Sequence, residues 1–269
     1  MADLTLLGAS IAYAIAATAY YLAVARRVRA PETLRIARIA LLSALVLHFM
    51  EIVHESLKVH RCPVTSTHFA VSLTGLVTVV MFLGLASRVR IESLGALVAL
   101  LGLVSFVSAQ FMHQSTAPLQ PTRVWLAIHI TSNMIGVGLF MLSAGVGAAY
   151  LAQARRLKAK RADAGHRQLP GLLPLEILMR RLLLVGFIPL SLGVITGSMF
   201  ANRIHLGGIE AMRVGLSYGV WLLVGVIIIG GPVGGWRGRK IAWGNILGAL
   251  ASIVVVVLYV LTPTITGGP

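Results

Sequence analysis

Eight long apolar stretches constrain what this chain can fold into. They run approximately over residues 3–25, 39–57, 68–87, 94–112, 125–152, 181–201, 214–232 and 241–262. A helix needs about 20 predominantly apolar residues to cross the hydrocarbon of a bilayer, and in lipid its backbone polar groups must be satisfied internally. Only 12% of the residues are charged and the mean hydropathy is +0.88, unlike a soluble domain. The sequence therefore predicts an all-α, polytopic membrane helical bundle of about eight transmembrane helices, with residues 1–269 forming a single integral membrane domain.

Arginine and lysine collect between alternate stretches, which predicts an orientation. Short loops rich in these residues stay on the cytoplasmic side. Of the 23 basic residues, 18 follow the first, third, fifth or seventh stretch, and five lie elsewhere: Lys58, Arg61, Arg123, Arg203 and Arg213. Both termini are therefore expected to be extracytoplasmic, in a multi-pass protein of a bacterial cytoplasmic (inner) membrane. Because the net charge of +15 follows this topology, we expect membrane lipid and not nucleic acid as its partner.

The last basic group before the sixth stretch is interleaved with leucines. Residues 155–181 combine clustered arginines with Leu172, Leu173, Leu175 and Leu178. Such a segment is expected to lie along the cytoplasmic surface and bind anionic lipid.

Histidines gather at one edge of the predicted membrane. Imidazole is the usual axial ligand of haem iron and a common ligand of other metals. One histidine, His166, is predicted to be cytoplasmic, and His48 lies within the second stretch. The other six lie at or beyond the outer edge: His54, His60, His68, His113, His129 and His205. For each histidine taken alone there is an alternative to metal binding, since a histidine near a helix end commonly contacts carbonyls or lipid headgroups.

The second stretch carries the densest set of polar residues. At about 100° per residue, His48, Glu51 and Glu55 share one helical face, and His54 lies on its flank. His48 is ten residues past Arg38, which places it roughly 15 Å into the bilayer. A group this deep needs a polar partner. Two interpretations stay open: His48 binds haem while the carboxylates tune it or receive a proton, or it makes an interhelical hydrogen bond to Ser, Thr or Asn.

The chain has one cysteine, Cys62, next to Pro63. A single cysteine excludes both an internal disulfide and a CxxCH haem-attachment motif. Any haem would therefore be non-covalently bound, and a b-type haem is the candidate cofactor.

Three segments resemble a known family. They are WLAIHITSNMIGVGLFMLSAGVGAAYL (125–151), LLPLEILMRRLLLVGFIPLSLGVITGSMFAN (172–202) and GWRGRKIAW (235–243). Together they resemble the cytochrome c assembly family of integral membrane proteins over about residues 40–260. Eight spans without a large extracytoplasmic domain look most like its small HemX and YpjD branch.

The resemblance implies roles for particular residues. The histidine in the opening of the fifth stretch, His129, corresponds to one that ligates haem at the outer face. His48, in a Leu-His context, looks like the counterpart of a histidine that binds haem within the membrane. Other family features are missing, because residues 197–213 lack the tryptophan-rich WWD motif of haem-handling members and have Phe200 where Trp is usual. His205 lies in this replacement segment and is a candidate substitute ligand, and His54 is the fourth candidate cofactor-binding residue.

The sequence leaves three functions open. The first is a haem-handling protein of cytochrome c biogenesis that binds haem at the outer face, by ligation and not by catalysis, with other maturation proteins or apocytochrome as partners. The second is a HemX-like regulatory or structural protein of tetrapyrrole synthesis that no longer binds haem. The third is a membrane subunit of a respiratory or transport complex, in which His48, Glu51 and Glu55 relay protons.

Overall fold

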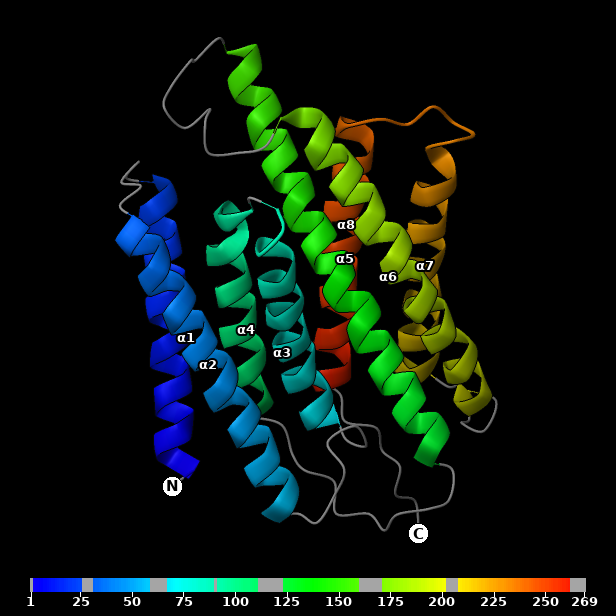
Figure 1. Ribbon diagram of the computed structural model, residues 1–269. Helices are drawn as coiled ribbons and strands as arrows, with labels where there is room; N and C mark the ends of the chain where they lie inside the picture. The colour runs from blue at the N-terminus through cyan, green and yellow to red at the C-terminus, as the bar shows by residue number, and fades with distance from the viewer. Residues whose placement is uncertain are drawn as a thin grey trace.

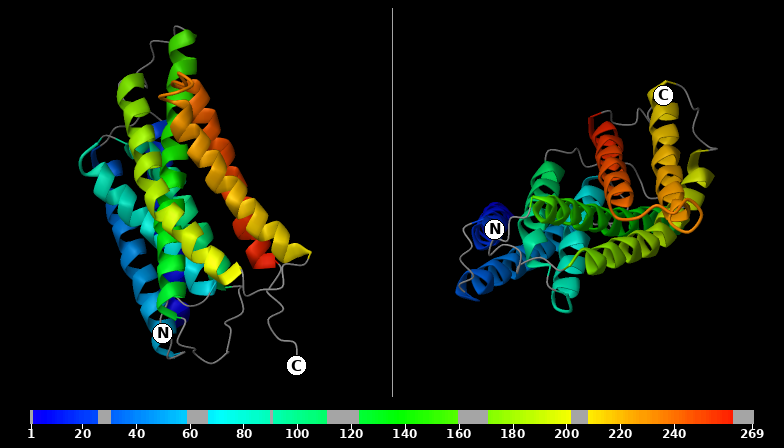
Figure 2. Two further views of the ribbon diagram at one scale, coloured as in Figure 1. Left: turned by 90° about the vertical axis from the view of Figure 1, so that its right-hand side faces the viewer. Right: turned by 90° about the horizontal axis from the view of Figure 1, so that it is seen from above.

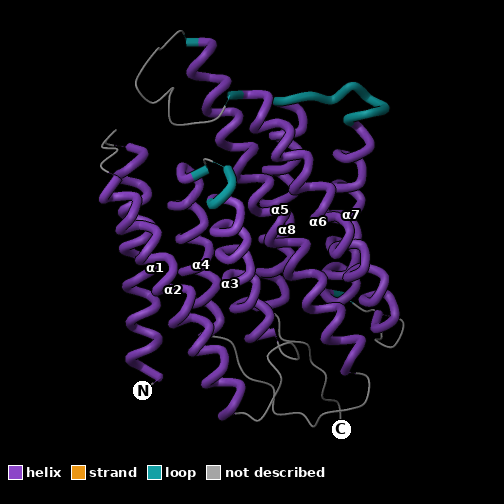
Figure 3. Tube along the Cα trace, in the orientation of Figure 1, coloured by secondary structure: helices purple, strands orange, loops and turns teal. Residues whose placement is uncertain are grey.

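The computed structural model describes residues 2–25, 31–58, 67–89, 91–110, 123–159, 171–201 and 208–261. These residues form long helices and no strands, which confirms the all-α prediction (Figure 3). The elements are α1 (Ala2–Ala25), α2 (Pro31–Lys58), α3 (Thr67–Ala86), the short 3-10 turn η2 (Glu92–Leu94), α4 (Gly95–Gln110), α5 (Arg123–Lys158), α6 (Leu172–Ala201), α7 (Ile209–Gly230) and α8 (Arg239–Leu261).

Consecutive helices run up and down, so that α1 begins and α8 ends at the same end of the bundle (Figure 1). At the other end α1 is followed by α2, α3 by α4, α5 by α6 and α7 by α8. The end that holds these four connections is called the basic end, because most of the basic residues flank them. The end where α1 begins and α8 ends is called the opposite end. At the basic end the Arg38 guanidinium lies 2.9 Å from the Glu92 carboxylate and ties α2 to η2.

Among the described residues, seven helices are long and apolar enough to cross a membrane, and the apolar part of α3, Val71–Ala86, is shorter. The polytopic bundle is thus confirmed, and two helices extend well beyond the starts of the apolar stretches that predicted them. Helix α2 begins at Pro31 and α6 at Leu172, because the opening segments of both helices contain charged side chains that lower the local hydropathy: Glu32, Arg35 and Arg38 in α2, and Glu176, Arg180 and Arg181 in α6. The leucines expected on the cytoplasmic surface therefore belong to α6 itself.

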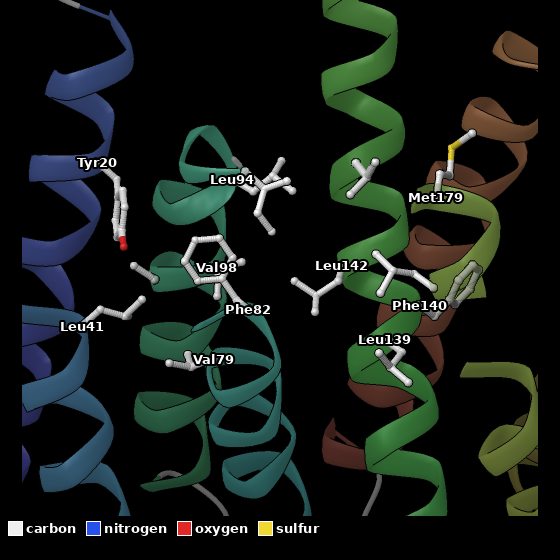
Figure 4. Close-up of a cluster of buried hydrophobic side chains, with 14 of the residues drawn as sticks. Tyr20, Leu41, Val79, Phe82, Leu94, Val98, Leu139, Phe140, Leu142 and Met179 are labelled. Carbon is white, nitrogen blue, oxygen red and sulfur yellow. The ribbon is translucent and has the colours of Figure 1, made fainter. Parts of the chain in front are cut away.

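The helices pack as two groups of four, α1–α4 and α5–α8, as Figure 2 shows from two sides. Helix α5 lies at the centre, since it contacts α6 and α8 in its own group and α3 in the other. One continuous set of buried apolar side chains runs through both groups (Figure 4). In that set Tyr20, Phe82 and Val98 come from the first group, and Leu139 and Met179 from the second.

Glycines allow α5 and α6 to approach closely. A Cβ atom at Gly136 would lie 2.9 Å from the backbone nitrogen of Leu190, and one at Gly186 would lie 2.9 Å from the Cβ of Leu139. Small residues allow such close approach between membrane helices, where packing replaces the hydrophobic effect as the driving force. This contact positions the candidate site near the opposite end.

Candidate functional site

His48 lies wholly buried in the α1–α4 group, with both ring nitrogens near a hydroxyl group. Its Nδ1 is 2.9 Å from the Tyr13 hydroxyl of α1, and its Nε2 is 2.8 Å from the Ser72 hydroxyl of α3. The Phe106 ring of α4 covers the imidazole at a centroid distance of 4.5 Å. A neutral imidazole has one donor and one acceptor nitrogen, so one hydroxyl donates to it and the other accepts from it. The four helices therefore meet around a satisfied histidine.

The carboxylates on the same face of α2 have different surroundings. Glu51 is 4% exposed and accepts a hydrogen bond from the Thr5 hydroxyl of α1. Glu55, one turn closer to the opposite end, is 2.9 Å from the Lys58 ammonium group. The two carboxylates that the sequence placed on one face thus have different partners. Glu51 is buried and bonded to a neighbouring helix, whereas Glu55 forms a salt bridge within α2.

His129 belongs to α5 and is half-buried where α5 faces α6, near the opposite end. Its Nδ1 lies 2.8 Å from the carbonyl oxygen of Gly193, and the Thr196 hydroxyl is 3.3 Å from the same nitrogen. One turn along α5, the Asn133 amide donates to the His129 carbonyl at 2.9 Å and approaches the ring. The imidazole is therefore oriented by polar groups from both helices.

The ring of His129 lies over a glycine pair on α6. A Cβ atom at Gly197 would lie 2.7 Å from its Cε1, closer than real Cβ contacts allow. A Cβ atom at Gly193 would overlap the Asn133 amide. This glycine pair thus forms a cradle that accepts the flat imidazole and the amide beside it.

The Gly193 carbonyl determines which nitrogen of His129 carries the proton. A carbonyl oxygen only accepts hydrogen bonds, so the 2.8 Å contact requires a proton on Nδ1. Nε2 then carries the lone pair of the neutral ring, and the Asn133 amide nitrogen lies 3.4 Å from it. Histidines that bind metals usually have this arrangement, with the second ring nitrogen donating to a carbonyl or carboxylate. The described residues around His129 therefore fit an iron ligand.

The structure does not bring the two histidines into one pocket. The polar contacts of His48 come from α1 and α3, and those of His129 come from α5 and α6. His54 is half-buried on α2, while His205 lies outside the described residues. Among the part of the chain that is described, no group of three or more His, Cys, Asp or Glu side chains could hold a metal ion.

Sequence reasoning missed the partners that orient the two histidines. Tyr13 and Ser72 hold His48, and Asn133 and Thr196 accompany His129. Asn133 follows His129 by four residues, which is a signal readable from helical periodicity. The others come from helices distant in sequence, so no spacing reveals them.

The burial of Arg213 was not predicted from the sequence. It was counted among the basic residues at the outer side, yet within α7 it is wholly buried. Its guanidinium donates a hydrogen bond of 3.1 Å to the Leu258 carbonyl near the end of α8. It thereby links the last two helices near the opposite end.

A family model described as "Cytochrome C assembly protein" matches residues 4–262. The match covers nearly the whole chain. It includes α1, which lies before the residues, about 40–260, over which the three segments indicated the resemblance. No curated protein and no solved structure matches the sequence significantly.

Proposed function

The chain belongs to the cytochrome c assembly protein family, and from this membership we propose that it binds haem non-covalently during cytochrome c biogenesis, with His129 as the iron ligand. The observation that carries the proposal is the 2.8 Å contact between Nδ1 of His129 and the Gly193 carbonyl. That contact puts the lone pair on Nε2 and holds the ring in one orientation. Iron at Nε2 would displace the Asn133 amide nitrogen, which lies 3.4 Å from it. Bound haem would supply an iron centre for ligation and for adjustment of redox potential.

The remaining residues of the cradle act on the imidazole. The Gly193 carbonyl keeps the proton on Nδ1, and Gly197 leaves room for the ring. Asn133 and Thr196 restrict its rotation from opposite helices. We propose that His205 and His54 are secondary candidates, and that other maturation proteins or apocytochrome receive the haem.

For His48 the contacts favour the hydrogen-bond interpretation. To bind iron it would have to give up the Tyr13 or the Ser72 hydroxyl, in a volume already filled by Phe106. A buried hydroxyl that loses its partner costs free energy in a membrane interior. We therefore propose that His48 holds α1, α2 and α3 together and that His129 binds the haem.

Titration of the purified protein with haemin tests this assignment. Wild-type protein should shift the Soret band of haemin, and His129→Ala should abolish the shift. His48→Gln is the matched control, because an amide can keep one donor and one acceptor at that position. Loss of the shift in His48→Gln but not in His129→Ala would reverse the assignment, and a wild-type protein that leaves the haemin spectrum unchanged would reject haem binding.

A HemX-like role without haem is the second candidate. It is favoured by the missing tryptophan-rich segment. In that case deletion of the protein should alter tetrapyrrole levels while haem attachment to apocytochrome c continues. If the protein instead binds haem for cytochrome c biogenesis, its deletion should stop haem attachment to apocytochrome c and leave tetrapyrrole levels unchanged.

We also propose that the basic end faces the cytoplasm of a bacterium. Both Val233, in the turn after α7, and Lys58, at the end of α2, are exposed at opposite ends of the bundle. In a Cys62→Ser background, Lys58→Cys should react with a membrane-impermeant thiol reagent in intact spheroplasts. Val233→Cys should react only after the membrane is opened, and the opposite pattern would invert the topology.

A further inference from the structure

A recess of about 430 Å³ lies at the basic end, between the first turns of α6 and the turn that joins α7 to α8. Helix α6 contributes Glu176 and Arg180, and the turn contributes Gly231 and Arg237. This turn contains the Gly-Trp-Arg-Gly motif, which the proposed haem site does not use. The recess is distant from His129, which lies near the other end of α5 and α6.

Arg180 is held in place by contacts on two sides. Its guanidinium is 2.9 Å from the Glu176 carboxylate and donates a 2.5 Å hydrogen bond to the Trp236 carbonyl. Its Nη1 lies against Gly231, where any Cβ atom would overlap it. Gly231 therefore leaves the space that this cation occupies.

Arg237 lies across the recess and is exposed. No ion pair joins it to a carboxylate within the described part of the chain. The recess thus has two guanidinium groups and one carboxylate, which leaves a positive charge. Arg181, Arg239 and Lys240 are nearby in sequence and add to the positive potential at this end.

The rim of the recess is apolar. Leu173 and Ile177 lie on the same face of α6 as Glu176 and Arg180, and their exposed fractions are 68% and 41%. In a membrane these side chains contact acyl chains. A cationic recess beside a lipid-facing strip, at the level where the spans end, matches an amphiphile with an anionic head.

We infer that this recess binds the phosphate group of an anionic phospholipid through Arg180 and Arg237, with the acyl chains along Leu173 and Ile177. The guanidinium group forms directed hydrogen bonds to phosphate oxygens, which suits both arginines to this ligand. The bound lipid would connect α6 to the turn before α8.

Native mass spectrometry of the full-length protein in detergent tests the inference, with phosphatidylglycerol as the probe and phosphatidylcholine as the neutral lipid. Wild-type protein should retain phosphatidylglycerol more tightly. Arg237→Gln and Arg180→Gln should each raise its dissociation constant about fivefold, because each removes one guanidinium–phosphate hydrogen bond. Arg237→Gln is the decisive variant, because no described hydrogen bond of the fold depends on that side chain.

Arg156→Gln is the matched control, since Arg156 is exposed at the same end on α5. It should leave the affinity unchanged. An equal loss in Arg156→Gln would show a general surface charge effect and overturn the specific site, as would equal retention of the two lipids. Displacement of phosphatidylglycerol by inorganic phosphate at equal concentration would identify a free-anion site and would also overturn the lipid assignment.

Discussion

The Cε1 atom of His129 on α5 lies 2.7 Å from the position that a Cβ atom would take at Gly197 on α6. The imidazole therefore occupies the volume that a side chain at Gly197 would need. The orientation of the ring depends on the absence of one methyl group on the neighbouring helix.

Gly197→Ala should displace this ring. We expect a loss of about 1–3 kcal/mol of stability from overpacking, together with weaker haemin binding because Nε2 is reoriented. Thermal denaturation in detergent and the Soret titration measure the two effects. Gly219→Ala on α7, where a Cβ atom would meet nothing within 4 Å, is the control and should leave both unchanged or slightly raise stability. Equal behaviour of the two variants would contradict the cradle.

Tyr13→Phe should destabilise the α1–α4 group without changing the affinity for haemin. The variant leaves Nδ1 of buried His48 without the hydroxyl that now lies 2.9 Å away. Interhelical hydrogen bonds in membranes contribute about 0.5–2 kcal/mol, so we expect a loss in that range. Unfolding in mixed detergent measures it, and Tyr21→Phe, at a residue that is 62% exposed, is the control. A shifted Soret band in Tyr13→Phe would indicate instead that His48 contacts the iron.

Ser143 and Asn245 should behave as a coupled pair. The buried Asn245 amide of α8 donates to the Ser143 hydroxyl of α5 at 2.7 Å, and that hydroxyl donates to the Met179 carbonyl of α6 at 2.8 Å. Ser143→Ala leaves a buried amide without this acceptor, so we expect a loss of about 1–2 kcal/mol. Adding Asn245→Leu should recover part of it, because an apolar replacement of both partners removes the unsatisfied group. Strictly additive losses in the double-mutant cycle would argue against this three-helix link.

Gly238→Ala should be more harmful than Gly235→Ala, although both glycines have a positive φ, of 48° and 63°. Left-handed backbone costs a residue with a side chain about 1–2 kcal/mol at either position. At Gly238 the new methyl group would in addition overlap the Tyr150 hydroxyl, whereas Gly235 faces open space. The midpoint of thermal unfolding should therefore fall further for Gly238→Ala, and equal shifts would show that the turn does not pack on Tyr150.

The bundle itself was predictable from the sequence. Residues that face lipid must be apolar over the whole length of a span, so hydropathy alone located the spanning helices, and the arginines and lysines indicated which connections lie at the same end of the bundle. Helices α2 and α6 begin before their apolar stretches because a helix continues into the headgroup region, where charged residues such as Arg38 and Arg180 are tolerated.

The site was only partly predictable. His48 and His129 stand out in the sequence, because an ionisable side chain in or near the hydrocarbon is costly without a partner. Which partner each one has was decided by tertiary structure, since the hydroxyls of Tyr13 and Ser72 and the Gly193 carbonyl come from separate helices. Composition and periodicity fix the length and direction of a membrane helix, while its rotation and its neighbours depend on close packing between side chains far apart in the chain.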